Sequence, residues 1–167
     1  ACGFCSVKTG KPTWNDPLEP IRVAQAVKKM GLRHVVITSV DRDDLKGDFG
    51  ASIWADTIKQ TKKVNPGCTV EVLTPDFKGF EPALKIVFDS KPDIFSHNVE
   101  CVERISKAVR AQANWQRSLG VLEKSIQHGL RTKTGIMVGL GEEVEEVKKT
   151  MRQVVDLGCL LYTSDAA

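Results

Sequence analysis

The sequence has 167 residues, of which 41% are hydrophobic and 27% charged, as is ordinary for a globular domain. The formal net charge is +3 and basic residues are mixed with acidic ones, which excludes the charge pattern of a nucleic-acid-binding protein. No apolar run approaches the ~20 residues of a membrane span, and no secretory signal is visible. With five unevenly spaced cysteines, we expect a reduced, cytoplasmic protein rather than a disulfide framework.

Expected strands and helices alternate along the whole chain. Apolar residues at helical spacing predict a first helix over 21–30, which ends at Gly31. The remaining periodicities predict strand 34–40, helix 51–64, strand 69–73, helix 82–88, strand 93–97, helix 118–128, strand 134–138 and helix 143–157. Four βα units predict a parallel sheet with helices outside, either a barrel or an open doubly wound sheet.

Polar side chains follow each of the four expected strands. They stand at 38–44, 74–76, 97–100 and 139–142. In parallel α/β sheets ligands bind at the carboxyl ends of strands, so polar groups recurring at all four ends favour a binding site there. Solvated loops are also polar, and this pattern alone does not identify the ligand.

Two cysteines near the start form a CxxC pair, Cys2 and Cys5. The pair is compatible with a zinc half-site, a thioredoxin-like dithiol or thiolate ligation of an iron–sulfur cluster. Zinc would need a second pair at ligand spacing, and a dithiol would open a helix, whereas a proline-rich loop follows here. A cluster would need a third cysteine before Ala1. Cys68 and Cys101 are interpreted as structural residues.

Five strings together resemble the lipoyl synthase family of radical S-adenosylmethionine (SAM) enzymes. They are ACGFC at the start, HVVITSVDRDDL at 34–45, VEVLTPDF at 70–77, FSHNVE at 95–100 and TKTGIMVGLGE at 132–142. The resemblance implies an α/β fold, a partial (β/α)6 radical-SAM barrel of the TIM type that is truncated at both ends. It also implies a [4Fe-4S] cluster that binds S-adenosylmethionine and cleaves it to a 5′-deoxyadenosyl radical.

The same resemblance implies a sulfurtransferase that acts on a protein-bound fatty acyl chain. Members insert two sulfur atoms at C6 and C8 of an octanoyl chain, which is carried on a lysine of a lipoyl carrier protein. The sulfur comes from an auxiliary [4Fe-4S] cluster, and a reductase or ferredoxin-type protein donates electrons. Neither nucleic acid nor a membrane is expected as a partner.

The resemblance also assigns roles to individual residues. Those expected to hold the cluster or S-adenosylmethionine are Cys2 and Cys5 (thiolates), Phe4 (shielding), Thr38 and Ser39 (methionyl amine), Asn98 and Glu100 (ribose and sulfonium), Lys133 and Thr134 (methionyl carboxylate), and Gly139 and Gly141 (close approach of the adenosine). Those expected to shape the substrate mouth are Asp41, Arg42 and Asp43. His97 is expected to face the other way as a structural histidine. The alternatives are strand-end capping for the hydroxyls, a solvated Lys133 and a solvated charge cluster at 41–44.

The sequence departs from the family at both ends. The first radical-SAM cysteine, the auxiliary-cluster cysteines and the C-terminal Arg-Ser-rich segment are absent from these 167 residues. We expect residues 1–158 to be an incomplete radical SAM core. The last nine residues, CLLYTSDAA, resemble a translated sequencing adaptor, and we expect 159–167 to be non-native. Residues 160–163 could pass for a strand. On this interpretation the fragment itself is inactive.

Three other functions are compatible with parts of the sequence. A second radical-SAM sulfur inserter, related to biotin synthase, would share the cluster but not the strings at 34–45 and 132–142. A βα-barrel lyase would use Lys133 as a Schiff base and would not need Cys2 or Cys5. A non-enzymatic iron–sulfur or zinc module would bind metal without affinity for S-adenosylmethionine.

Overall fold

The computed structural model describes residues 3–8, 10, 12–159 and, for the backbone only, 161–166. The chain divides into two compact units. Residues 11–95 form one, here called the α1–α3 unit, and residues 1–10 together with 96–167 form the other, the α4–β5 unit. None of the helices built from the described residues is long and apolar enough to cross a bilayer.

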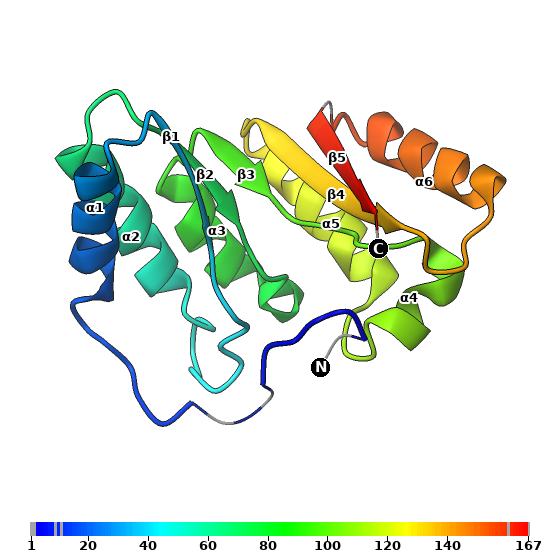
Figure 1. Ribbon diagram of the computed structural model, residues 1–167, viewed down its shortest axis with the longest axis horizontal. Helices are drawn as coiled ribbons and strands as arrows, with labels where there is room; N and C mark the ends of the chain where they lie inside the picture. Colours follow the sequence, from blue (N-terminus) through cyan, green and yellow to red (C-terminus); the bar gives the residue numbers. More distant parts are fainter. Residues whose placement is uncertain (1–2, 9, 11, 160, 167) are drawn as a thin grey trace. The chain divides into compact units, whose positions relative to one another are not determined.

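The α1–α3 unit alternates helices and parallel strands (Figure 1). Its elements are α1 (Glu19–Met30), β1 (His34–Thr38), α2 (Ala51–Val64), β2 (Thr69–Leu73), the 3₁₀ turn η1 (Phe77–Gly79), α3 (Glu81–Asp89) and the start of β3 (Ile94–Ser96). Strand β1 pairs in parallel with β2, from His34 opposite Thr69 to Thr38 opposite Leu73. The strand order in this unit is β1-β2-β3. The unit is therefore a run of βα repeats in chain order.

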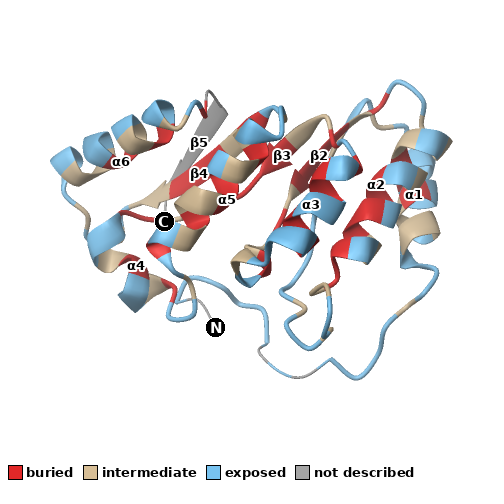
Figure 2. Ribbon diagram, turned by 180° about the vertical axis from the view of Figure 1, so that it is seen from behind, coloured by how far each residue is buried: buried red, intermediate tan, exposed pale blue. Residues whose placement is uncertain are grey.

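The helices of this unit cover one face of its strands, as Figure 2 shows from behind. Val70 and Val72 on β2 are completely buried on that face, whereas β1 alternates between half-buried and exposed residues. Phe88 on α3 packs edge-to-face on Phe95, with ring centroids 5.0 Å apart. Each such buried side chain contributes about 1.5–3 kcal/mol of hydrophobic stabilisation. The core of this unit therefore lies between its helices and strands.

The α4–β5 unit repeats the same pattern. Its elements are the end of β3, α4 (Glu103–Val109), α5 (Trp115–Gln127), β4 (Thr132–Val138), α6 (Val144–Asp156) and β5 (Leu161–Ala166), in the strand order β3-β4-β5. Strand β4 pairs in parallel with β5 from residue 133 to residue 138. Its core holds Val99, Val102, Trp115, Leu122 and Ile136.

The structure confirms the predicted helices and strands, with several ends displaced and one helix added; α5 begins at Trp115 rather than 118, and β4 at Thr132 rather than 134. The strand predicted over 34–40 ends at Thr38, and the one over 93–97 is only Ile94–Ser96. Helix α4 was not predicted, because its short ERISKAV segment follows a strand end without the apolar periodicity of the longer helices. Residues 161–166 form β5 against β4. That 159–167 are non-native stays a prediction.

Candidate cofactor and substrate site

The cysteine loop is tied to the end of α4. The Gly3 N–H donates to the carbonyl of Val109, the last residue of α4, at 2.8 Å. Cys5 is an exposed free thiol, and Phe4 is 39% exposed. Cys2 lies outside the described residues, and the described part of the chain contains no group of three or more His, Cys, Asp or Glu that could hold a metal. An accessible thiol in a loop, without a disulfide, fits the soft thiolate ligand that an iron–sulfur cluster takes.

The turn that follows β3 is fixed from its helix-covered side. His97 is buried, and its Nε2 lies 3.1 Å from the Ser118 hydroxyl on α5, which matches the structural role expected for this histidine. The Thr134 hydroxyl donates to the His97 carbonyl at 2.8 Å and accepts from the Val99 N–H at 3.2 Å. Thr134 is therefore engaged by the backbone of this turn, a structural use of a residue that we expected at the methionyl carboxylate.

Asn98 and Glu100 lie beyond the strand that was expected to carry them. Because β3 ends at Ser96, strand alternation does not set their directions, and Glu100 has a φ of +67°. Glu100 is held by its backbone, which accepts from Met137 N–H at 2.7 Å and donates to the Gly135 carbonyl at 3.0 Å. The premise of a continuous strand was wrong, and the assigned roles stay predictions.

Gly135 makes room for the Asn98 side chain. A Cβ built on Gly135 would lie 2.7 Å from Asn98 Oδ1, closer than real Cβ contacts allow. Sequence reasoning missed this residue. The available signal was a glycine inside an expected strand, which often marks the close approach of another group. Gly135 therefore sets the position of Asn98.

Alternation along β4 separates the two residues that we expected to share the methionyl carboxylate. The Thr132 hydroxyl lies 2.7 Å from Ser125 on α5, so Thr132 and Thr134 belong to the helix-covered side. Lys133 and Gly135 alternate with them and belong to the opposite face, where Asn98 lies over Gly135. Lys133 is half-buried. Its position is compatible with the predicted role, whereas that of Thr134 favours a structural one.

The loop after β4 is stabilised by a carboxylate within it, that of Glu142. Gly139 and Gly141 have φ values of +101° and +98°, a conformation that favours glycine. Glu142 accepts from the N–H groups of Gly139 at 2.5 Å and Leu140 at 2.9 Å. The hydrogen bond from Gly139 is the main reason that the pKa of Glu142 is lowered. Glu142 thus fixes the backbone of this loop, and the role predicted for its two glycines stays a prediction.

Arg104 on α4 joins this loop to the start of α6. Its guanidinium donates to the Gly141 carbonyl at 2.9 Å and forms a two-bond ion pair with Glu146 at 2.6 and 2.8 Å. Glu146 also accepts from the Glu143 N–H at 2.8 Å, completing a capping box. The Arg104 hydrogen bond and that of Glu143 lower the pKa of Glu146 to about 2. Sequence reasoning missed Arg104 because it missed α4.

In the α1–α3 unit, the two hydroxyl groups at the end of β1 donate hydrogen bonds to backbone carbonyls. Thr38 donates to the Leu73 carbonyl at 3.1 Å, and Ser39 donates to that of Val40 at 2.9 Å. Each oxygen is then left with its lone pairs as acceptors, which is the complement of an amine donor. Both residues also line a pocket with Arg42, Phe49 and apolar residues of α1 and α2. The geometry is compatible with the amine-binding role and with strand-end capping.

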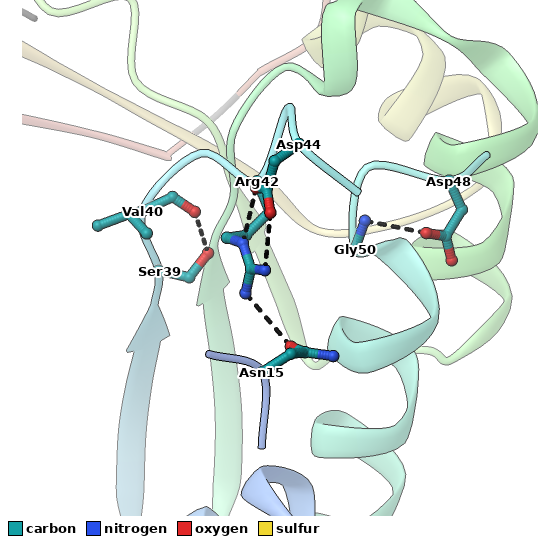
Figure 3. Close-up of polar contacts among 7 residues, drawn as sticks. All are labelled: Asn15, Ser39, Val40, Arg42, Asp44, Asp48 and Gly50. Carbon is teal, nitrogen blue, oxygen red and sulfur yellow. Dashed lines mark hydrogen bonds and ion pairs between the residues drawn. The ribbon is translucent and has the colours of Figure 1, made fainter. Parts of the chain in front are cut away.

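The loop between β1 and α2 is built around Arg42 (Figure 3). Its Nε and Nη2 donate to the two carboxylate oxygens of Asp44 at 2.9 and 3.0 Å, and its Nη1 donates to Asn15 Oδ1 at 3.3 Å. The hydrogen bond to Asp44 is the main cause of a raised pKa for Arg42. Asp48 ends the loop by accepting from Gly50 N–H at the start of α2, at 2.9 Å. Arg42 therefore shapes the loop from within.

A second set of contacts joins this loop to the one after β2. Asp43 pairs with Lys78 at 3.2 Å, and Lys78 Nζ lies 5.3 Å from the ring centroid of Phe49. Phe49 packs edge-to-face on Phe80 with centroids 6.0 Å apart. Phe49, Phe77 and Lys78 all have positive φ, which is costly for side chains of this size. Strained residues of this kind concentrate at functional sites, and sequence reasoning missed them.

The chain belongs to the radical SAM superfamily, whose family model matches residues 1–154. Membership implies a [4Fe-4S] cluster and S-adenosylmethionine as cofactors. The fold agrees. Streptococcus suis SuiB superposes with a TM-score of 0.73 at 11% identity, covering 99% of this chain and 36% of that protein. Methylornithine synthase (PylB) superposes with a TM-score of 0.68 at 12% identity, covering 90% of this chain and 44% of that one. These likenesses confirm the partial radical-SAM barrel.

The chain is also similar to curated lipoyl synthases. That of Rubrobacter xylanophilus is 55% identical over 165 residues, which is 98% of this chain and 51% of the relative. That of Phocaeicola vulgatus is 50% identical over 163 residues, 98% of this chain and 57% of the relative. The chain thus spans about half the length of the curated relatives it matches.

Proposed function

We propose that the full-length protein encoded by the gene carrying this sequence, here called the parent protein, is a lipoyl synthase of the cytoplasm. It inserts sulfur at C6 and C8 of an octanoyl chain attached to a lysine of a lipoyl carrier protein. The observation that carries the proposal is the 55% identity to a lipoyl synthase over 165 residues, nearly the whole chain. The matched span includes the strand-end loops, where binding and catalytic residues concentrate.

Cys5 provides a cluster thiolate on this proposal, and Cys2 provides a second. The cluster, when bound, supplies the electron that cleaves S-adenosylmethionine to a radical able to remove hydrogen from the octanoyl chain. Phe4 beside Cys5 limits the access of water to the cluster. The exposure of Cys5, which forms no disulfide, supports its part in this assignment.

The strand-end residues hold S-adenosylmethionine by complementary polar groups. Thr38 and Ser39 accept from the methionyl amine through oxygens whose protons are committed to carbonyls. Lys133 pairs with the carboxylate, from the same face of β4 as Gly135, over which Asn98 is held. Asn98 and Glu100 face the ribose and sulfonium, and the backbone at Gly139 and Gly141 accommodates the adenosine.

The loop at 39–50 forms the mouth through which the octanoyl chain enters. Asp41 and Asp43 are exposed, and Asp43 is paired with Lys78. Arg42 maintains the loop through Asp44 and Asn15, so its contribution to the substrate is indirect. Sulfur is drawn from an auxiliary [4Fe-4S] cluster with ligands outside these 167 residues. Electrons come from a reductase or ferredoxin-type donor.

The test compares substrates on the anaerobically reconstituted parent protein. The protein is incubated with S-adenosylmethionine, a reductant and either an octanoylated carrier, the same carrier with a bare lysine, or dethiobiotin. We expect 5′-deoxyadenosine to rise with the octanoylated carrier alone. A rise with dethiobiotin alone would favour a biotin-synthase-like enzyme. Borohydride trapping of a keto substrate on Lys133, without any cluster, would favour the lyase.

A further inference from the structure

We propose that α4 is a brace for the cofactor site and that Arg104 and Arg110 are its positioning residues. Helix α4 and its C-cap residue Arg110 contact three segments of their own unit: the cysteine loop, the turn at 97–100 and the loop at 139–142. The inference deepens the proposed function and rests on it in one respect, because it takes these segments to hold the cluster and S-adenosylmethionine. It does not depend on which substrate receives sulfur.

The first contact is made by the backbone alone. Gly3 N–H donates to the Val109 carbonyl at 2.8 Å, at the carboxyl end of α4 (Figure 1). A Cβ on Gly3 would lie 3.6 Å from that same oxygen, an ordinary contact distance. The cysteine loop is therefore attached to α4 directly beside Arg110, and a displacement of this helix end displaces the loop.

The second contact is made by Arg110, which is only 9% exposed. Its Nη1 donates to the Val99 carbonyl at 2.9 Å, between Asn98 and Glu100. A buried guanidinium is costly unless it is hydrogen-bonded, so this bond is a strong constraint on the turn. The turn needs one, because Glu100 has a φ of +67° that its own side chain disfavours.

The third contact is made by Arg104 near the amino end of α4. It donates to the Gly141 carbonyl and pairs with Glu146 through two hydrogen bonds. Because Glu142 fixes the same loop from inside, Arg104 sets where the preformed loop lies relative to α4. One seven-residue helix thus locates a cluster ligand, the ribose-binding turn and the adenosine-binding loop against each other.

The first test needs neither cluster nor cofactor. Hydrogen exchange of backbone amides is followed by mass spectrometry in the parent protein without iron, for Arg104→Gln, Arg110→Gln and the control Lys85→Gln. The control breaks the exposed Lys85–Asp89 pair on α3, outside both segments. We expect faster exchange over 139–146 in the first variant, over 97–102 in the second, and in neither segment in the control. Equal or uniformly raised exchange would overturn the brace.

The second test measures the dissociation constant of S-adenosylmethionine for the reconstituted protein. Each glutamine variant is expected to weaken binding about 10-fold, the effect of losing one charge-assisted hydrogen bond. Arg110→Lys should recover part of it, because an ammonium can still donate to one carbonyl. Unchanged binding in both glutamine variants would refute the proposal. If these shifts appear while octanoyl chains stay untouched, the brace stands and the lipoyl synthase proposal fails.

Discussion

The two units hold their strand-end loops in different ways. In the α1–α3 unit, the 39–50 loop is fixed by pairs of side chains, Arg42 with Asp44 and Asp43 with Lys78. In the α4–β5 unit, the turn and the loop are fixed through backbone carbonyls that accept from Arg110, which follows α4, and from Arg104 on α4. A side-chain pair depends on two residue identities, whereas a carbonyl is offered by any residue. We therefore expect the first arrangement to tune substrate entry and the second to hold a common cofactor geometry.

The largest effect is expected at the cluster. Cys5→Ala in the parent protein should remove the iron of this cluster, leaving that of the auxiliary cluster, and should abolish formation of 5′-deoxyadenosine, because a cluster cannot lose a thiolate ligand without loss of its chemistry. Iron content and nucleoside yield are measured together. Cys68→Ala is the control, since Cys68 is buried at the start of β2, and it should keep both. Full iron content in Cys5→Ala would refute the ligand assignment.

The next largest effect is expected on β4, in the α4–β5 unit. Gly135→Ala should displace Asn98, lower the free energy of unfolding by about 1–3 kcal/mol and weaken S-adenosylmethionine binding. Gly120→Ala is the matched control in α5, where an added Cβ meets nothing within 4 Å. It should instead stabilise the helix by about 0.5–1 kcal/mol. Equal responses of the two variants in denaturant unfolding would contradict the close approach at Gly135.

A smaller effect is expected in the unit fixed by side chains. Lys78→Met removes the ion pair with Asp43 and the contact with the Phe49 ring. Together these are worth about 0.7–1.4 kcal/mol, so KM for the octanoylated carrier should rise about 3- to 10-fold while S-adenosylmethionine binding is kept. Lys85→Met, which breaks an exposed pair with Asp89 on α3, is the control. If only the dissociation constant of S-adenosylmethionine rose, the assignment of substrate entry to the α1–α3 unit would be contradicted.

The smallest effect is a pH dependence at Glu146. Its pKa is lowered from 4.5 to about 2, so its stabilising contribution is present above pH 4.5 and is lost as pH falls toward 2. The stability difference between wild type and Glu146→Gln should be constant above that range and shrink below it. Because the pair is exposed, the difference should also shrink with salt. A stability difference that grows on acidification would contradict a lowered pKa of Glu146 in the folded protein.

Much of the fold could be predicted from the sequence. The helix over 51–64 and the strand over 69–73 match the structure, because strong periodicity and terminators such as Asn65 and Gly31 act locally. The strand after residue 93 could not be placed as well, since its end is set by long-range bonds from β4. Helix α4 was missed because its seven residues are stabilised by contacts that no local pattern records.

The candidate site could likewise be predicted only in part. Motif strings predicted which loops carry polar groups, and the positive φ of Gly139 and Gly141 agrees with the backbone approach expected of them. The partners of those loops lie 30 or more residues away in the chain, as for Arg104 and Gly141, or Asp43 and Lys78. Such pairs depend on the folded arrangement of strands and helices. They could not be predicted from spacing.

The most direct test of the proposed function uses an octanoylated carrier deuterated at C6 and C8. The parent protein is incubated anaerobically with this carrier, S-adenosylmethionine and a reductant, and both products are analysed by mass spectrometry. We predict that deuterium appears in 5′-deoxyadenosine and that the carrier gains two sulfur atoms at the positions that lost deuterium. Deuterium-free 5′-deoxyadenosine with an unchanged octanoyl chain would contradict the proposal and leave the protein as a radical SAM enzyme with another substrate.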